Sequence, residues 1–216
     1  MRKPPISYAT LVGTAARAPL ALMLGGAVVG MSSVVSHASS GEASQTAPPA
    51  IVQAAPVARP PQSLRSGTRV SERRLGVRVF ADARNGFALA STQQAQYPAA
   101  TSDGGKVWRI AGPPLHVNAA QAPLVVLQVG IAGRHTYFAW GGPGGGQVVD
   151  VTSDGGRRWW RAVLGEVVLA VVASAGGRLT AVAQSGAASG SGSVTTVYVS
   201  SDGGRSWRSD ASLGAG

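Results

Sequence analysis

Three aspartates recur in the same surroundings and are the first candidates for chemistry. Each stands in the octapeptide pattern [ST]-S-D-G-G-[KR]-x-W, and Asp103, Asp154 and Asp202 are 51 and then 48 residues apart. A carboxylate that returns beside serine, glycine and tryptophan could mark a tripled active site. Self-similarity at this period instead indicates a repeat architecture, in which one structural unit is built several times.

Local physical chemistry accounts for every defined position of this octapeptide, which we call the box. Asp-Gly favours a hairpin turn, because glycine accepts the positive φ that such turns need. The aspartate can accept hydrogen bonds from backbone N–H groups that follow it, and the preceding hydroxyl offers another local partner. The tryptophan would anchor the returning strand in the core. We therefore interpret the box residues as structural, not catalytic: Thr101, Asp103, Gly105, Trp108, Thr152, Asp154, Gly156, Trp159, Ser200, Asp202, Gly204 and Trp207.

The box resembles the Asp-box, or BNR repeat, S/T-x-D-x-G-x-x-W, which is known from sialidases, sortilin-type receptors and the photosystem II assembly-factor propellers. All three copies match at every defined position. The resemblance covers about residues 76–208 and implies a β-propeller, in which the box joins the last two strands of a blade on the rim away from the ligand face. It therefore implies a fold more than an activity.

Short valine-rich runs separated by glycine turns surround the boxes and show no helical period. The predicted strands are 77–80, 87–90, 97–100, 108–110, 124–131, 135–140, 147–151, 159–163, 167–172, 179–183 and 194–199. We predict an all-β, β-propeller-like fold of three four-stranded Asp-box blades after a disordered N-terminal region. Propellers usually close with about 4–8 blades. Three blades predict an incomplete ring, a ring completed by a homodimer, or a truncated propeller.

The chain divides into three parts by composition. Residues 1–38 combine Arg2 and Lys3 with the apolar run Ala18–Val35 and the small-residue site Ser36-His37-Ala38. These features predict a cleaved signal peptide or an uncleaved signal anchor, and a secreted or membrane-anchored location outside the cytoplasm; a cytoplasmic protein is the remaining alternative. Residues 39–75 form a Pro/Ala/Ser-rich linker whose prolines should interrupt any helix or strand. Residues 76–216 hold the repeats.

The net charge of +10 arises from 19 basic and 9 acidic side chains and is spread along the chain. Its concentration in Arg65–Arg78 fits either a solvated tether or a contact with anionic lipid or cell-wall polymers. No basic strip interleaved with aromatics suggests nucleic-acid binding. The chain has no cysteine, so it has no disulfide framework and no cysteine-based metal or redox site.

An enzyme of the sialidase type is the competing prediction, as a fragment or relative of an exo-glycosidase. Glycoside hydrolysis requires two carboxylates on one cleft, and the carboxylates outside the boxes of the repeat region are Asp82, Asp150, Glu166 and Asp210. Tyr137 with Glu166 is the conceivable nucleophile pair. The Arg-Ile-Pro motif of sialidases is missing, because Ala follows Arg109-Ile110. We therefore predict no catalytic residue.

The histidines and carboxylates show no metal-ligand spacing, so no metal or cofactor is expected. Trp140 and Trp160 are the candidate binding residues, as stacking platforms for a sugar or a peptide. Trp160 should face away from Trp159, because successive side chains of a strand point to opposite faces. The favoured prediction is thus a non-catalytic binding or scaffolding module with an unidentified protein or carbohydrate ligand.

Overall fold

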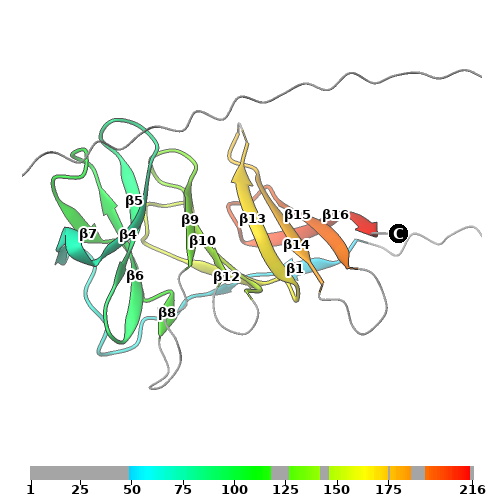
Figure 1. The fold of residues 1–216 in the computed structure, drawn as a ribbon, viewed down its shortest axis with the longest axis horizontal. Helices are drawn as coiled ribbons and strands as arrows, with labels where there is room; N and C mark the ends of the chain where they lie inside the picture. The colour runs from blue at the N-terminus through cyan, green and yellow to red at the C-terminus, as the bar shows by residue number, and fades with distance from the viewer. Residues whose placement is uncertain (1–48, 118–126, 142–145, 175, 186–192, 215–216) are drawn as a thin grey trace, which may run out of the picture. The chain divides into compact units, whose positions relative to one another are not determined.

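In the residues that the structure describes, antiparallel β-sheets account for all regular structure except one short helical turn (Figure 1). The computed structural model describes residues 49–117, 127–141, 146–174, 176–185 and 193–214, which belong to one unit, Thr46–Gly216. The predicted all-β class is confirmed for these residues. The predicted leader, residues 1–38, lies outside them. No helix in the described residues is long and apolar enough to cross a membrane.

The strands form three sheets, here named A, B and C. Sheet C has the order β3-β7-β6-β5-β4, with β8 paired to β6: β3 Arg69–Val70, β4 Leu75–Phe80, β5 Gly86–Ser91, β6 Ala95–Thr101, β7 Trp108–Ile110 and β8 His116–Val117. Sheet B has the order β2-β12-β11-β10-β9: β2 Ala55–Pro56, β9 Gln128–Ile131, β10 Tyr137–Gly141, β11 Val148–Thr152 and β12 Trp160–Val163. Sheet A has the order β1-β16-β15-β14-β13: β1 Ile51–Gln53, β13 Val167–Ala173, β14 Leu179–Gln184, β15 Val194–Ser200 and β16 Ser206–Gly214.

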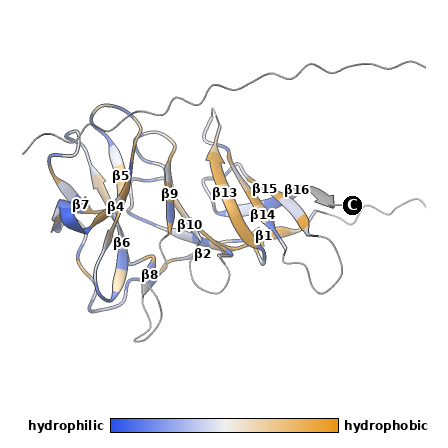
Figure 2. Ribbon diagram, viewed as in Figure 1, coloured by the Kyte–Doolittle hydropathy of each residue, from blue (hydrophilic) through white to orange (hydrophobic). Residues whose placement is uncertain are grey.

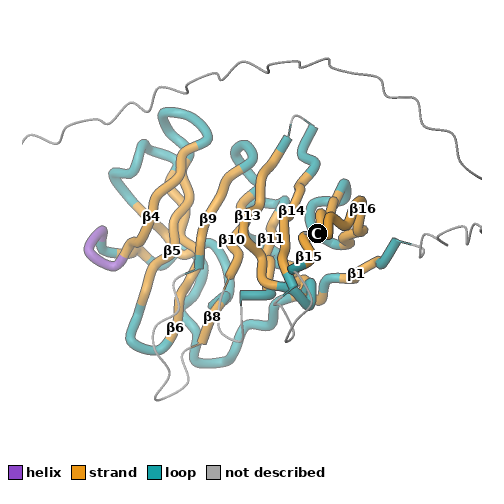
Figure 3. The backbone as a smooth tube through the Cα atoms, turned by 45° about the vertical axis from the view of Figure 1, so that its right-hand side comes forward, coloured by secondary structure: helices purple, strands orange, loops and turns teal. Residues whose placement is uncertain are grey.

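Each sheet therefore contains four consecutive strands in chain order, and each box connects the third strand to the fourth. The strands on both sides of the box pair directly, as in Ala100 with Arg109, Val151 with Trp160, and Val199 with Arg208. Figure 3 shows the strands of the three sheets and the helical turn η1, Glu72–Arg74, which precedes β4.

A fifth strand in each sheet comes from residues 49–70, which we call the edge segment. This differs from the expectation that residues 39–75 form a linker without strands. Val52 pairs with Trp207 in sheet A, and Val70 pairs with Trp108 in sheet C. In sheet B the N–H of Val57 donates to the carbonyl of Trp159 at 2.8 Å. One valine of the edge segment thus lies beside the tryptophan of every box.

The prolines of the edge segment are compatible with these strands because the segment occupies only sheet edges. A proline lacks one donor, and an edge strand needs backbone partners on one side alone. Pro56 lies in β2 opposite Trp160 and is exposed. The edge segment also covers the backbone of β7, β12 and β16, which would otherwise be unpaired.

Three hydrophobic clusters form the core. The first lies between sheets C and B and contains Phe87, Leu89, Leu115, Leu127, Val129, Tyr137, Ala139 and Trp159. The second lies between sheets B and A and contains Phe138, Val149, Val151, Ala162, Leu164, Val168, Val171, Leu179, Ala181, Ala183, Tyr198 and Trp207. The third covers the other face of sheet C and contains Val70, Ala88, Ala90, Ala95, Tyr97, Ala99, Trp108 and Ile110.

Candidate functional site

The three boxes form the same hydrogen-bonded turn. In the first, the Thr101 hydroxyl donates to Asp103 Oδ1 at 2.7 Å and accepts from the N–H of Gly105 at 3.1 Å. Asp103 Oδ1 also accepts from the N–H of Val107 at 3.0 Å. The N–H of Gly104 reaches the carbonyl of Arg84, in the turn between β4 and β5, at 2.9 Å. The side chains of the box thus bond the backbone of their own turn.

The second and third boxes repeat these bonds with small changes. Asp154 Oδ1 accepts from the Thr152 hydroxyl at 2.9 Å and from the N–H of Arg158 at 3.0 Å. Asp202 accepts from the hydroxyls of Ser200 and Ser206 at 2.8 and 2.6 Å. The aspartate oxygens of all three boxes are used in these turns, which favours the structural interpretation.

These bonds lower the pKa of each box aspartate. Hydrogen bonds from the Val107 N–H and the Thr101 hydroxyl hold the pKa of Asp103 below its ordinary value. Burial raises the pKa of Asp154, but hydrogen bonds from the Arg158 N–H and the Thr152 hydroxyl outweigh it, and the net pKa is lowered. A catalytic acid at neutral pH needs a raised pKa, so the three carboxylates are unsuited to that role.

Two of the box glycines touch the preceding sheet. Gly105, Gly156 and Gly204 occupy the same place in their boxes and have φ of 89, 93 and 86°. A Cβ on Gly156 would overlap the carbonyl of Ala111 after β7, and a Cβ on Gly204 would lie 2.5 Å from Val151 Cβ in β11. The second and third boxes are therefore contact points between neighbouring sheets.

The box tryptophans are buried, but their indole N–H groups differ. Trp159 Nε1 donates to the carbonyl of Ala111 in the neighbouring sheet at 3.0 Å, and Trp207 Nε1 donates to the carbonyl of Gly204 at 3.2 Å. Trp108 Nε1 is buried and has no partner among the described residues. The three indole N–H groups therefore have different partners, although the box sequences match.

The two residues considered as a nucleophile pair have separate partners: Tyr137 lies in β10 of sheet B, and Glu166 lies in the bend between β12 and β13. The Tyr137 hydroxyl donates to the carbonyl of Arg134 at 2.7 Å, and burial raises the Tyr137 pKa. Glu166 accepts from the hydroxyl of Thr196 at 3.1 Å, and its other carboxylate oxygen is buried without a partner. No interaction joins Tyr137 to Glu166 in the described residues.

The remaining carboxylates are also engaged. Asp150 is fully buried and accepts from Nε and one terminal nitrogen of Arg161, both at 2.8 Å. Burial raises the pKa of Asp150, while Arg161 opposes this; the same hydrogen bonds raise the pKa of Arg161. Asp82 accepts hydrogen bonds within the 82–85 turn, and the bond from the Asn85 side chain is the main cause of the strongly lowered pKa of Asp82. Asp210 lies 3.8 Å from Arg178.

The histidines form no metal site. His135 is exposed, and desolvation together with the charge of Arg161 lowers the pKa of the half-buried His116. The described residues contain no group of three or more histidine, cysteine or carboxylate side chains able to hold a metal ion.

A groove beside the second box brings arginines together with the candidate residue Trp160. It has a volume of about 330 Å³ and is lined by Pro56, Val57, Arg59, Pro113, Arg157, Arg158, Trp159 and Trp160. We call it the Trp160 groove. Trp159 is buried, whereas Trp160 is half-buried on the opposite face of the chain, as its position after Trp159 predicts.

The arginines of the Trp160 groove form no direct ion pair with a described carboxylate, although the charge of Arg157 helps to lower the pKa of Asp154. Arg59 donates to the carbonyl of Leu64 and to Ser66 Oγ, which are neutral acceptors. Arg157 and Arg158 are exposed, and none of the three forms an ion pair with a described carboxylate. The guanidinium carbon of Arg205 lies 5.6 Å from the centre of the Trp160 ring. This geometry is a cation–π contact and adds a fourth positive charge near the indole.

Trp140, the other candidate binding residue, lies in a different environment. Its ring stacks on Phe138, with centres 6.0 Å apart, and packs against the core between sheets B and A. The groove contains Trp160 but not Trp140.

A larger cavity of about 650 Å³ lies under the edge segment. It is lined by Val52, Gln53, Ala55, Pro56, Val57, Ala58, Pro60, Pro114, Leu115, His116, Arg161 and Val163. Its one arginine is neutralised by the two hydrogen bonds to Asp150. The Trp160 groove is smaller but holds free charge, so it is the better candidate for a polar ligand.

The sequence singled out Trp160 as a candidate but did not indicate the arginines that line the groove with it. Arg59 belongs to the predicted linker, and nothing in its local sequence places it beside the second box. Comparison with protein-family models, with curated proteins and with solved structures finds no significant match.

Proposed function

We propose that this chain is a non-catalytic binding module of the Asp-box, β-propeller-like class, and that it binds an acidic saccharide in the Trp160 groove. The observation that carries the proposal is the presence of three arginines without carboxylate partners around a half-buried indole. The N-terminal segment would place the module outside the cytoplasm, either secreted or anchored to the membrane.

The propeller-like architecture is supported by the repeated pattern of strands. Each sheet has four consecutive antiparallel strands with a box before the fourth, and neighbouring sheets pack through apolar faces. In this proposal the sheets are blades, and the edge segment adds one outer strand to each. The boxes define the blades, and the ligand is bound beside the second box, where Arg157 and Trp159 of the box and residues outside it line the groove.

The ligand class follows from the chemistry of the Trp160 groove. Guanidinium groups bind carboxylate and sulfate oxygens through paired hydrogen bonds, and their geometry is better suited to this than that of lysine. An indole and two prolines, Pro56 and Pro113, present flat apolar surface on which a sugar ring can stack. An acidic saccharide combines both features in one molecule.

The competing glycosidase function lacks a suitable pair of carboxylates in the described residues. The box aspartates have lowered pKa values and bond their own turns, Asp150 is paired with Arg161, and Glu166 bonds Thr196. The Trp160 groove contains no carboxylate. Binding without turnover is therefore the better account of the site.

Titration calorimetry with a uronic-acid oligosaccharide and a sialylated trisaccharide tests the proposal. We expect binding that weakens as salt is raised, because exposed charges are screened. Trp160→Ala and Arg158→Ala should each weaken binding by about 10-fold or more, the usual effect of losing a stacking or charge-assisted contact. Arg84→Ala removes an exposed arginine outside the groove and serves as the matched control.

Three outcomes would contradict the proposal. Equal binding of the wild type and the Trp160→Ala variant would place the ligand elsewhere, and binding of acidic peptides but not saccharides would change the ligand class. Release of a fluorophore from a sialoside, abolished by Glu166→Gln, would establish the glycosidase instead.

A further inference from the structure

The two faces of each sheet are used in a regular way. Sheet C packs on sheet B through Phe87 and Leu89, and sheet B packs on sheet A through Phe138, Val149 and Val151. In both cases the face of one sheet receives the box tryptophan of the next, Trp159 or Trp207. In the described residues, no further sheet packs on the corresponding face of sheet A.

Residues at matching places confirm that this is the equivalent face. Val149 and Val151 precede Asp154 by five and three residues, as Val197 and Val199 precede Asp202. Val149 and Val151 are 0 % exposed, whereas Val197 and Val199 are half-buried. The equivalence is also structural, because Val199 pairs with Arg208 as Val151 pairs with Trp160.

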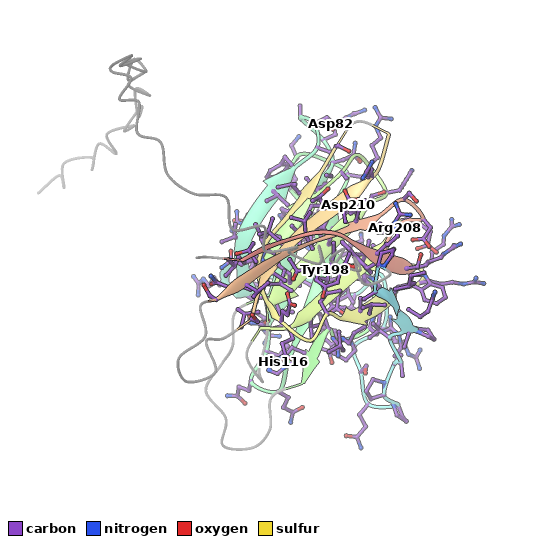
Figure 4. The ribbon with its side chains drawn as sticks, turned by 90° about the vertical axis from the view of Figure 1, so that its right-hand side faces the viewer. Asp82, His116, Tyr198, Arg208 and Asp210 are labelled. Atoms are coloured by element: carbon purple, nitrogen blue, oxygen red, sulfur yellow. The ribbon has the colours of Figure 1, made fainter. Side chains whose placement is uncertain are left out.

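We call this surface the open A face, defined by the outward side chains of β13, β14 and β15: Leu169, Val172, Thr180, Val182, Thr195, Val197 and Val199. Leu169 is 53 % exposed and Val172 is 57 % exposed. Figure 2 shows β13 as one of the most hydrophobic strands of the chain. Charged residues occur only on β16, where Arg208 and Asp210 are labelled in Figure 4, so the centre of the face is uncharged.

The opposite end of the stack, the outer face of sheet C, is closed by the chain itself. Ala88, Ala90 and Ala99 lie on this face and are at most 2 % exposed. The cluster around them contains residues of the sheet C strands, with Leu75 at the start of β4 packed against it, and Leu64 of the edge segment, which precedes β3, also packs on it. Small alanine side chains allow this close covering. The stack therefore has one capped end and one open end.

We propose that the open A face binds the open A face of a second copy of this chain, in a two-fold symmetric dimer. The open A face corresponds to the faces through which sheet C packs on sheet B and sheet B packs on sheet A. Another sheet of the same repeat is therefore the surface that fits it. A stack of repeats needs its terminal faces covered. A two-fold interface uses the same patch on both copies and leaves only the capped sheet C ends outermost.

The capped end argues against the other assembly, a head-to-tail ring of two chains. Such a ring would have to place the open A face of one copy on the outer face of sheet C of the other. Residues 64–75 already cover that face and would have to leave it. The two-fold dimer requires no rearrangement, and its uncharged centre brings no like charges together.

The size of the face sets the strength of the contact. The three strands of the face, about 4.8 Å apart and about six residues long at about 3.3 Å per residue, give a footprint of about 14 by 20 Å, or roughly 280 Å² per copy. Counted over both copies, this area is below the roughly 1,200 Å² of standard stable interfaces, so the dimer belongs to the weak, transient class and the equilibrium should be followed over about 10 µM to 1 mM protein.

Sedimentation velocity of the full-length chain in mild detergent tests the dimer. We expect a mass that approaches twice 21.7 kDa as concentration rises. Val197→Arg places an unpaired charge in the centre of the face and should weaken association by about 100-fold. Val77→Arg, at a 64 % exposed valine of sheet C, is the matched control and should dimerise as the wild type does.

A wild type that stays monomeric over this range would overturn the proposal. Dimers that persist unchanged in Val197→Arg would do the same, because they would form through the N-terminal segment or another surface. Circular dichroism of Val197→Arg shows whether the variant is folded; Val199→Lys replaces it if it is not.

Cross-linking separates the two-fold dimer from the ring. The chain has no cysteine, so single cysteines can be introduced without background. Val197→Cys should cross-link to itself through a short bismaleimide. Cross-linking of Val197→Cys to Arg74→Cys, but not to itself, would indicate the head-to-tail ring and overturn the two-fold arrangement.

Discussion

Replacing the equivalent glycine of each box by alanine separates backbone strain from sheet-to-sheet packing. Gly105, Gly156 and Gly204 share nearly the same φ, 89, 93 and 86°. An L-residue in this left-handed region costs about 1–2 kcal/mol. This cost should be common to all three variants, so differences among them report the space around each glycine.

The surroundings of the three glycines differ sharply. A Cβ on Gly105 would lie 3.5 Å from Trp108 Nε1, which is ordinary contact. A Cβ on Gly156 would overlap the backbone carbonyl of Ala111, which belongs to the neighbouring sheet and accepts the Trp159 hydrogen bond. Overpacking of this kind costs typically about 1–3 kcal/mol more. Gly156→Ala should therefore lower the free energy of unfolding by about 2 kcal/mol more than Gly105→Ala.

Urea denaturation followed by tryptophan fluorescence measures this difference. With a slope of about 2 kcal/mol per molar urea, the midpoint of Gly156→Ala should lie about 1 M below that of Gly105→Ala. Gly204→Ala should also have a midpoint below that of Gly105→Ala, because its Cβ would lie 2.5 Å from Val151 Cβ, which cannot move without the backbone of β11. If Gly156→Ala does not fold, the urea midpoint of Gly204→Ala still measures the cost of crowding a contact between sheets. Equal midpoints for all three variants would refute the role of the box glycines as contacts between sheets.

Two further predictions concern single interactions of the boxes. Trp159→Phe loses the hydrogen bond to the Ala111 carbonyl, whereas Trp108→Phe removes an N–H without a partner. Trp159→Phe should therefore lower the free energy of unfolding by about 1–2 kcal/mol more than Trp108→Phe in the same urea assay. An equal loss in the two variants would contradict this hydrogen-bond geometry. Because its folded-state pKa is lowered, Asp154 stabilises the fold fully above its unfolded pKa of about 3.9, and this contribution is lost as pH falls below that value. Urea midpoints from pH 6 to pH 2 should therefore decline less steeply in Asp154→Asn than in the wild type, and parallel curves would contradict the assignment.

The repeat signal made the strand content predictable. Each box closes its turn through bonds between residues at most four positions apart, such as Thr101 to Gly105 and Asp103 to Val107. Local bonds of this kind depend on the octapeptide alone. The alternation of buried and half-buried side chains at Trp159 and Trp160 was predictable for the same reason, because it follows from strand geometry.

The Trp160 groove was only partly predictable. Trp160 follows a box and could be identified from its position, but Arg59 is about 100 residues earlier in the sequence, in a proline-rich stretch without periodicity. Its place beside the second box depends on the pairing of β2 with β12. The pairing of Asp150 with Arg161 likewise depends on the register between β11 and β12.

The sequence by itself determined the three turns, their spacing and the strands that flank them, because those features rest on bonds within a few residues. Only the tertiary structure decided that residues 49–70 contain the three short edge strands β1, β2 and β3. Their partners lie in β7, β12 and β16, and the bond from the Ala50 N–H to Ser209 Oγ spans 159 residues. Only the tertiary structure decided which sheet faces are covered, since the matching valines of β11 and β15 differ in exposure through their neighbours and not through their sequence.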